Sequence, residues 1–208
     1  MKTQIIQGLV KYSLEHEKSP ANVYQLAKFL SITEEEFYEY FSSIEAVEEA
    51  VLTQAWSDAF HSLSSDSTFS DFSLKEKLIS LHFGWIEKLT AMRSYLQWKT
   101  KEWKNPMVGL AVLKTLRNQV ISDLEMLFKV AQQNGELPDR KFLDKLSNEA
   151  VWMNTAFILH FWLNDSSPRF EKTDACIEKS IGLTMDLIGR NTLDQAIDFG
   201  KFLFQQSK

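Results

Sequence analysis

The chain has 208 residues, of which 44% are hydrophobic and 25% are charged, and its formal net charge is −5 at pH 7. This composition is that of an ordinary globular protein and excludes disordered and fibrous chains. The length is sufficient for one medium domain, or for a small head and a larger body. Only seven Gly and four Pro are present, so turns are few and long helices are favoured.

The chain carries a single cysteine, Cys176, so it cannot form an intrachain disulfide. A reducing, cytoplasmic location is therefore expected. The N-terminus lacks the apolar stretch and the cleavage site of a signal peptide. The longest uncharged run, residues 150–164, has 15 residues and is too short to cross a bilayer. We expect a soluble protein.

The first two predicted helices pack on each other through apolar stripes. The spacing of Ile5, Leu9 and their neighbours predicts a helix over residues 3–16. A second helix should begin with Ser19 as its cap and Pro20 as its first residue, and continue to Leu30.

A short third helix is predicted after a tight turn. Thr33 and Glu36 have the spacing of a capping box, so this helix should start at Thr33 and run to about Phe41. A second capping box at Ser42 and Glu45 should begin a fourth, linking helix. Two helices joined by a tight turn, the second of them short, are typical of the helix-turn-helix, whose second helix usually enters a major groove.

These residues resemble the tetracycline-repressor (TetR) family over roughly residues 3–56. The matching positions are Val23, Leu26, Ala27, Ile32, Thr33, Phe37, Tyr38, Tyr40, Phe41, Ser43, Glu45, Ala46 and Val47. The resemblance implies an all-α fold with an N-terminal helix-turn-helix head and a helical body for ligand binding and dimerisation. It also implies DNA contacts from Thr33, Tyr38 and Tyr40 on the recognition helix, with Lys28 near the DNA backbone.

The charge of the head departs from the family pattern. The helix expected to face DNA carries Glu34, Glu35, Glu36 and Glu39, and residues 1–60 hold four cations against ten acidic residues. Ile44 stands where the family usually has a phosphate-binding Lys, and Leu30 replaces the usual turn Gly. Protein cations that neutralise DNA phosphates release counterions, and this release supplies most of the non-specific affinity. A head with few cations can release few of them. Two interpretations stay open: a regulator with unusual DNA contacts, or a TetR-like scaffold that binds a hydrophobic molecule or lipid without binding DNA.

The apolar spacing in the rest of the sequence predicts a helical body after a Ser-rich loop. We expect the head with its linking helix to span residues 1–60 and the ligand-binding and dimerisation domain to span 61–208. Ser73 should cap the first body helix. The helices expected after the loop at 61–73 cover residues 74–92, 95–104, 107–133, 140–163 and 170–189. In the resembled family the last two long helices form an intersubunit bundle, which implies a homodimer.

The body is rich in large aromatic side chains. An aromatic cavity that binds a small hydrophobic effector is one explanation, and an aromatic core with a dimer interface is the other. The candidate wall residues are Trp85, Trp98, Trp103 and Trp152, and the candidate polar anchors are Asn154 and His160.

Other functions have little support in the sequence. His16, His61, His82 and His160 show no metal-binding spacing, and neither a phosphate loop nor a catalytic motif is present. We therefore expect no enzyme activity, metal or cofactor. Residues 193–205 form an amphipathic segment that either docks on the body or a second subunit, or lies on a membrane surface, for which its cations are few.

Overall fold

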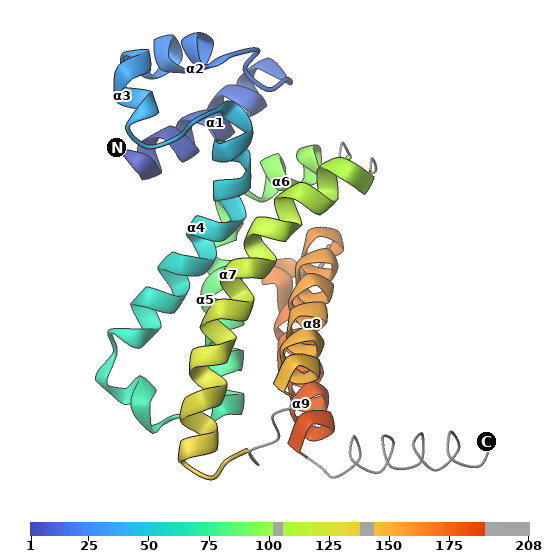
Figure 1. Ribbon diagram of the computed structural model, residues 1–208. Helices are drawn as coiled ribbons and strands as arrows, with labels where there is room; N and C mark the ends of the chain where they lie inside the picture. Colours follow the sequence, from blue (N-terminus) through green and yellow to red (C-terminus); the bar gives the residue numbers. More distant parts are fainter. Residues whose placement is uncertain (102–105, 138–143, 190–208) are drawn as a thin grey trace, which may run out of the picture. The chain divides into compact units, whose positions relative to one another are not determined.

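The computed structural model describes residues 1–101, 106–137 and 144–189, and within these residues it is helical and contains no strand (Figure 1). The all-α prediction is confirmed. The α-helices of the described residues are α1 (Lys2–His16), α2 (Val23–Leu30), α3 (Glu34–Tyr38), α4 (Ile44–Ser64), α5 (Leu74–Thr90), α6 (Arg93–Lys99), α7 (Pro106–Gln133), α8 (Asp144–Asn164) and α9 (Glu171–Gly189). Two short 3-10 helices, η1 (Ser67–Asp71) and η3 (Pro168–Phe170), also lie within the described residues.

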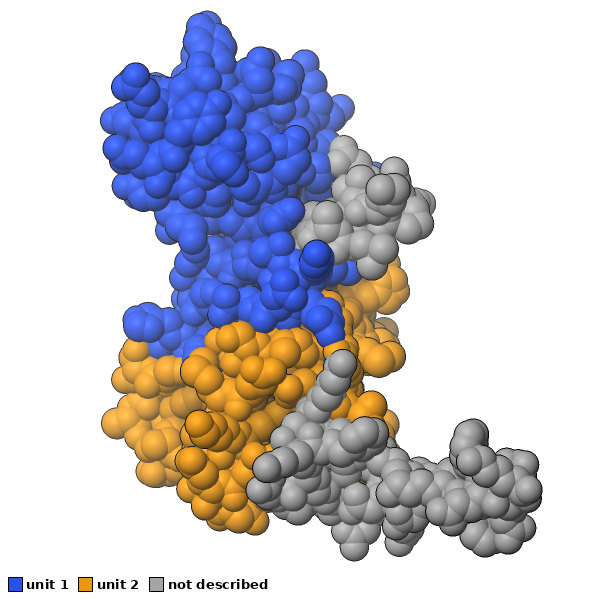
Figure 2. Space-filling view, in the orientation of Figure 1, with its two compact units in different colours: residues 1–62, 84–120 blue, residues 63–83, 121–208 orange. Residues whose placement is uncertain are grey.

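The chain divides into two compact units (Figure 2). Unit 1 consists of residues 1–62 and 84–120, and unit 2 consists of residues 63–83 and 121–208. The predicted boundary near residue 60 lies close to the first passage from one unit to the other. Residues 84–120 then return to unit 1, so α6 and part of α7 accompany the helix-turn-helix. The functional division predicted at residue 60, between a helix-turn-helix head and a ligand-binding and dimerisation domain, stays a prediction.

In unit 1, α1 and α2 approach each other closely. Ile5 and Leu9 are fully buried on the inner face of α1, as the apolar stripe predicted. Gly8 lies on the same face, where an added Cβ would overlap the side chain of Leu30 on α2. The absence of a side chain at Gly8 therefore allows the two helices to pack at this distance.

Two predicted helix starts in unit 1 were wrong. α2 is capped by Asn22, whose side chain accepts a hydrogen bond from the Gln25 N–H (3.0 Å), and not by Ser19 with Pro20 at the first position. Similarly, α4 begins after Ser43, whose hydroxyl accepts from the Ala46 N–H (3.2 Å), and not after Ser42. In both places several polar residues lie close together, and tertiary contacts decide which of them becomes the cap.

The predicted loop at 61–73 was also partly wrong, because α4 continues to Ser64 and η1 occupies residues 67–71. Asp66 stabilises η1 by accepting hydrogen bonds from the N–H and hydroxyl of Thr68 (2.9 and 2.8 Å). Ser73 forms the predicted cap of α5. Its hydroxyl accepts from the Glu76 N–H at 3.4 Å, while the Glu76 carboxylate accepts from the Ser73 N–H at 2.8 Å.

In unit 2, α8 and α9 pack along each other and are joined by a tightly bonded turn (Figure 1). The carboxylate of Asp165 accepts hydrogen bonds from the N–H and hydroxyl groups of Ser167 and of Thr173, at 2.7 to 2.9 Å. Although burial opposes the charged form, these four hydrogen bonds hold the pKa of Asp165 well below its usual range. The turn that the sequence predicted only as a break is thus held by one carboxylate.

A buried histidine, His82, connects α5 to α8 inside unit 2. Its Nδ1 lies 2.7 Å from the Leu78 carbonyl, so Nδ1 carries a proton and donates. Its Nε2 lies 2.9 Å from the hydroxyl of Thr155. Burial lowers the pKa of His82 to about 4, against the smaller raising effect of the bond to Leu78. The ring is therefore neutral at pH 7.

Some predictions fall on residues that the structure does not describe. Trp103, the start of the predicted helix at 140–163 and the amphipathic segment 193–205 lie outside the described residues. Within the described part of the chain, no helix is both long and apolar enough to cross a bilayer.

Because the pKa of His82 is about 4 in the folded chain and about 6.5 in an unfolded one, unfolding takes up a proton between these values. The free energy of unfolding should therefore fall by about 3 kcal/mol as the pH is lowered from 7 to 4 on account of this group. Urea unfolding at several pH values measures the slope.

The variant His82→Leu should lose most of this pH dependence, because it has no titrating group at the buried position. His160→Gln replaces an exposed histidine of the same unit and should keep the slope of the unmodified protein. An unchanged slope in His82→Leu would show that other groups control the acid sensitivity.

Candidate functional site

The turn between α2 and α3 is closed by backbone hydrogen bonds at Ser31. This residue has a left-handed conformation (φ 57°), and its N–H donates to the Lys28 carbonyl (3.2 Å). The N–H of Ile32 donates to the Ala27 carbonyl (3.0 Å), which completes a Schellman motif. Glycine usually occupies such a position, and here Ser31 takes it. The direction of α3 is therefore fixed by backbone bonds.

The start of α3 is the predicted capping box. The Glu36 N–H donates to the hydroxyl of Thr33 (3.1 Å), and the Thr33 N–H donates to the Glu36 carboxylate (2.8 Å). The predicted end at Phe41 was wrong, because α3 stops at Tyr38. The N–H groups of both Tyr40 and Phe41 donate to the Phe37 carbonyl, so the chain turns there. Tyr40 consequently lies after the recognition helix.

All four predicted DNA-contacting side chains are exposed on the head. Lys28 and Thr33 line one shallow hollow together with Tyr24, Glu34 and Glu35. Tyr38 and Tyr40 are 53% and 43% exposed and lie outside that hollow. Phe37, between them and the core, is fully buried and anchors α3. The structure thus brings Lys28 and Thr33 together and leaves the two tyrosines on another part of the surface.

The carboxylates on α3 and at its C-terminal cap are also exposed. Glu34, Glu35, Glu36 and Glu39 all face solvent, and Lys28 is the cation that shares a hollow with two of them. Just beyond, hydrogen bonds to its own backbone N–H and to Ser43 lower the pKa of Glu45, so it too is negative at pH 7. An approaching phosphate would meet more negative than positive charge at this surface.

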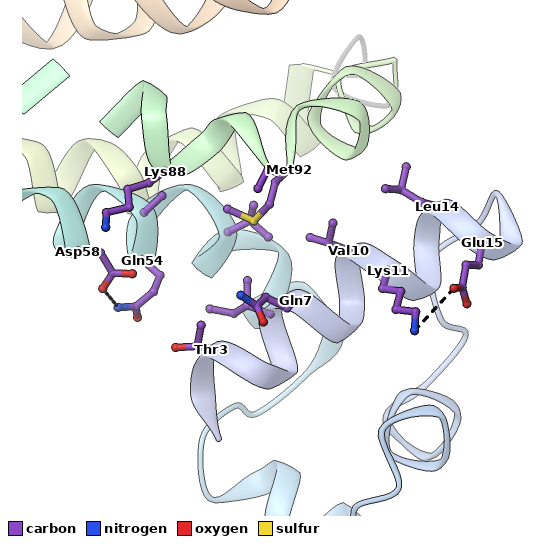
Figure 3. A pocket seen from close by; sticks show the side chains of 14 residues that line it. Thr3, Gln7, Val10, Lys11, Leu14, Glu15, Gln54, Asp58, Lys88 and Met92 are labelled. Atoms are coloured by element: carbon purple, nitrogen blue, oxygen red, sulfur yellow. Dashed lines mark hydrogen bonds and ion pairs between the residues drawn. The ribbon is translucent and has the colours of Figure 1, made fainter. Parts of the chain in front are cut away.

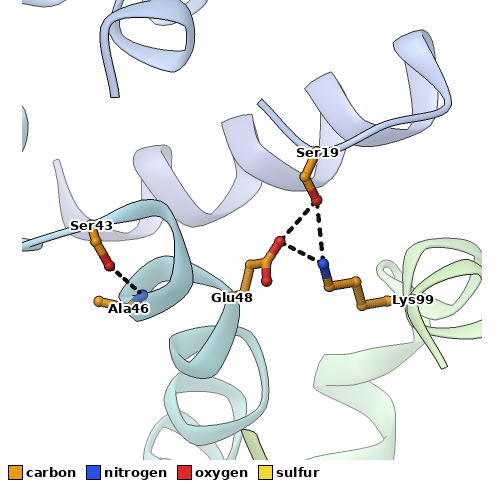
Figure 4. Close-up of polar contacts among 5 residues, drawn as sticks. All are labelled: Ser19, Ser43, Ala46, Glu48 and Lys99. Atoms are coloured by element: carbon orange, nitrogen blue, oxygen red, sulfur yellow. Dashed lines mark hydrogen bonds and ion pairs between the residues drawn. The ribbon is translucent and has the colours of Figure 1, made fainter. Parts of the chain in front are cut away.

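A nearly buried ion pair ties the head to α6 within unit 1 (Figure 4). The Lys99 ammonium of α6 lies 2.7 Å from the Glu48 carboxylate of α4, and the two side chains are only 6% and 12% exposed. Ser19, in the connection between α1 and α2, donates to the same carboxylate oxygen (2.9 Å) and accepts from Lys99 (3.3 Å). We call Ser19, Glu48 and Lys99 the head latch.

The patterns in the sequence did not predict the head latch. Its members are 29, 51 and 80 positions apart, and each residue type has an ordinary local role at its position. The order of the helices alone did not show that α6 returns to the head. An unusual charge on the apolar side of the predicted helix at 95–104 was the available signal, since Lys99 neighbours the buried Tyr95 and Leu96.

Two of the predicted ligand-binding tryptophans lie in unit 1. Trp85 is fully buried and packs edge to face on Trp56, with 5.4 Å between ring centroids. Its indole N–H points at the Leu52 carbonyl at 3.4 Å. Trp98 is half-buried beside Tyr95, with 5.9 Å between centroids. In this structure Trp85 is a core residue.

The other described candidates lie on α8 in unit 2. Trp152 is half-buried, and Asn154 is buried with no hydrogen-bond partner for its amide nitrogen among the described residues. His160 is exposed, and its carbonyl accepts from the Asn164 side chain (2.7 Å). The structure therefore does not bring Asn154 and His160 together. Their role in ligand binding stays a prediction.

The family model described as "Tetracyclin repressor-like, C-terminal domain" matches residues 77–203, which is more than half of the chain. The chain belongs to the tetracycline-repressor family. The match begins within α5 and covers the TetR body, whereas the sequence resemblance lay in the head, so two separate regions point to one family. No curated protein matches the chain.

Solved structures of TetR regulators share the fold. A TetR transcriptional regulator from Nitrosomonas europaea is 16% identical and superposes with a TM-score of 0.65, covering 88% of this chain and 97% of its own. FadR from Bacillus halodurans, a fatty acid degradation regulator, is 18% identical with a TM-score of 0.62, covering 88% and 94%. PfmR from Thermus thermophilus is 15% identical with a TM-score of 0.50, covering 88% and 97%.

Removing one partner of the head latch should strongly destabilise this TetR protein. Replacing Lys99 by Met leaves the Glu48 carboxylate poorly solvated and without its cation, so unfolding free energy should fall by about 3 kcal/mol. The double variant Glu48→Gln with Lys99→Met should be more stable than the sum of the single effects, because no unpaired charge remains. Urea unfolding of the four proteins measures the coupling.

Lys11 and Glu15 provide the matched control, since they form an exposed ion pair at 3.8 Å within α1. The same double-mutant cycle there should give a coupling below about 0.5 kcal/mol. Equal couplings for the two pairs would mean that burial does not strengthen the head latch.

Proposed function

We propose that the protein is a ligand-responsive transcriptional regulator that binds duplex DNA through α3 and acts as a homodimer. The observation that carries this proposal is the geometry of the head. A backbone-closed turn and a capping box hold a short, exposed helix, which is the arrangement that presents a recognition helix to a major groove. Membership of the TetR family supports the same function.

Within this proposal, Thr33 and Tyr38 contact the DNA from α3, Tyr40 contacts it from the following turn, and Lys28 binds a phosphate. All four side chains are exposed. Phosphate contacts position a protein on DNA, and base contacts provide sequence specificity. With one cation and several carboxylates in this region, most of the affinity has to come from hydrogen bonds and aromatic contacts.

The effector is a small hydrophobic molecule that binds the family's C-terminal, ligand-binding domain. Trp98, Trp152 and Asn154 fall within the matched residues 77–203 and are half-buried or buried, which supports contacts with an apolar ligand. The unsatisfied amide nitrogen of Asn154 is suited to orient an acceptor group of such a ligand.

The homodimer is proposed to form through α8 and α9. Both helices expose large apolar side chains at helical spacing: Leu146, Met153 and Phe157 on α8, and Leu183 and Leu187 on α9. Met153 and Leu183 are 69% and 63% exposed, which is unusual for apolar residues of a stable monomer when they occur in a continuous stripe. A second copy of the same surface would cover them.

DNA binding should depend only weakly on salt if Lys28 supplies the main phosphate contact. With one such contact per subunit, the logarithm of the binding constant should fall against log salt with a slope of about −2 per dimer. Lys28→Gln should weaken binding to all duplexes and flatten this slope. Glu35→Gln should strengthen binding several-fold, because it removes a repulsive charge beside Lys28.

Fluorescence anisotropy on a random duplex and on the DNA upstream of the protein's own gene measures both effects. Lys129→Gln, at an exposed position of α7, is the control and should change neither affinity nor slope. No binding of either duplex at low salt would refute DNA recognition.

The dimer proposal makes a separate prediction. Met153→Glu places a charge in the exposed apolar stripe of α8 and should convert the dimer into a monomer, which light scattering after gel filtration detects. Met126→Glu makes the same change at a methionine of α7 that is 51% exposed and lies outside the stripe, so the dimer should persist. Dissociation by both substitutions would place the interface elsewhere.

A second candidate function is favoured by the acidic recognition helix. The four exposed glutamates of the α3 region suit a TetR-fold protein that binds a hydrophobic small molecule or lipid and has lost DNA binding. Co-purification of a hydrophobic molecule with a protein that binds no duplex would support this function over the first.

A further inference from the structure

An apolar hollow lies in unit 1 between α1, α4 and the end of α5, and no predicted site residue lines it (Figure 3). Its volume is about 590 Å³, which is within the usual range for sites that bind small molecules. The lining residues come from α1, α4, α5 and the turn that follows α5. It is therefore distinct from a site made only by helices of the body.

The floor of the hollow is apolar. Ile6 and Val10 of α1 and Val51 and Ala55 of α4 are buried residues that line it. Met92, after α5, points between α1 and α4 from the opposite side (Figure 3). A methionine can adapt its side chain to ligands of different shape. The floor can thus take an aliphatic chain, and burying that chain supplies most of the binding free energy.

The polar groups stand around the rim. At one end the Lys11 ammonium is 3.8 Å from the Glu15 carboxylate, so these two charges balance each other. At the other end are Asp58 and Lys88 (Figure 3). Asp58 accepts a hydrogen bond from the Gln54 amide (2.8 Å), whereas the Lys88 ammonium has no hydrogen-bond or ion-pair partner among the described residues.

We propose that this hollow binds a small amphipathic anion, namely an aliphatic chain with a terminal carboxylate. The chain lies on Ile6, Val10 and Val51, and the carboxylate pairs with the free ammonium of Lys88. Because α1 belongs to the helix-turn-helix head and α5 leads into the body, such a ligand holds the first head helix against α4 and α5. Binding at this site does not require that the protein binds DNA.

Decanoate is the direct probe, used below its micelle concentration with the full-length protein. Isothermal titration calorimetry should give a dissociation constant on the order of 10 to 100 µM. Decanol has the same chain without the charge and should bind about threefold more weakly. Decyltrimethylammonium carries the opposite charge and should bind most weakly. Tightest binding of the cation would assign the headgroup contact to Asp58 and overturn the proposed anion.

Filling the hollow tests its location. Gln7 is exposed and lines the hollow, so Gln7→Trp should occupy the space and reduce decanoate affinity at least tenfold. Gln4→Trp makes the same substitution at an exposed position of α1 outside the lining and should leave the affinity unchanged. Circular dichroism verifies that both variants fold. Unchanged binding in Gln7→Trp would place the ligand elsewhere and refute the site.

The role of Lys88 has its own control. Lys88→Gln should weaken decanoate about threefold and leave decanol unchanged, because it removes the charge and keeps the apolar floor. Lys18→Gln removes another exposed lysine of unit 1 that does not line the hollow and should have no effect. Equal affinity of the Lys88→Gln variant and the unmodified protein for decanoate would overturn the proposed headgroup contact.

Discussion

The ion pair between Lys99 and Glu48 is the contact on which the arrangement of unit 1 depends. Placing an ammonium in a nearly dry site is costly unless a carboxylate and further hydrogen bonds replace the water, and here Glu48 and Ser19 do so. The three groups come from α6, α4 and the connection between α1 and α2. Their mutual contacts require these three segments to lie together in unit 1. The head latch therefore specifies where α6 lies on the head, in addition to any stability that it contributes.

This constraint explains why the compact unit that contains the head also includes residues 84–120. Trp85 of α5 packs against Trp56 of α4 in the same unit, so α4 is held to α5 by the apolar core and to α6 by the head latch. A shift of α6 would have to move α4 with it or break the buried charge pair. α4 is also the helix that follows α3 in the chain, so the packing of unit 1 joins α5 and α6 to the helix next to α3.

Local sequence patterns were sufficient to predict that these segments are helical and to identify two of the N-cap residues. The Thr33–Glu36 capping box and the Ser73 cap involve residues three apart, and the sequence alone predicted both correctly. Ser19 was misassigned because its hydroxyl bonds to Glu48, 29 positions away, which leaves Asn22 to cap α2. Contacts between residues far apart in the sequence also decide where binding sites form, and local patterns do not reveal them. Aromatic content could not distinguish Trp85 in the core from a cavity wall, and the hollow beside α1 combines three helices that share no local motif.

The acidic residues in the first turn of α3 compensate for the short length of this helix. A helix of five residues gains little from propagation and is marginal unless its ends are satisfied. Glu36 closes the capping box, and Glu34 and Glu35 lie in the first turn, where negative charge interacts favourably with the helix dipole by about 0.3 to 1 kcal/mol each. Three of the four carboxylates that an approaching phosphate would meet, those of Glu34, Glu35 and Glu36, thus also stabilise α3. Replacing them by cations would add attraction to DNA and at the same time destabilise the helix that we propose enters the groove. A cation placed outside the first turn of α3 avoids this conflict, and Lys28 on α2 is such a cation beside Glu34 and Glu35.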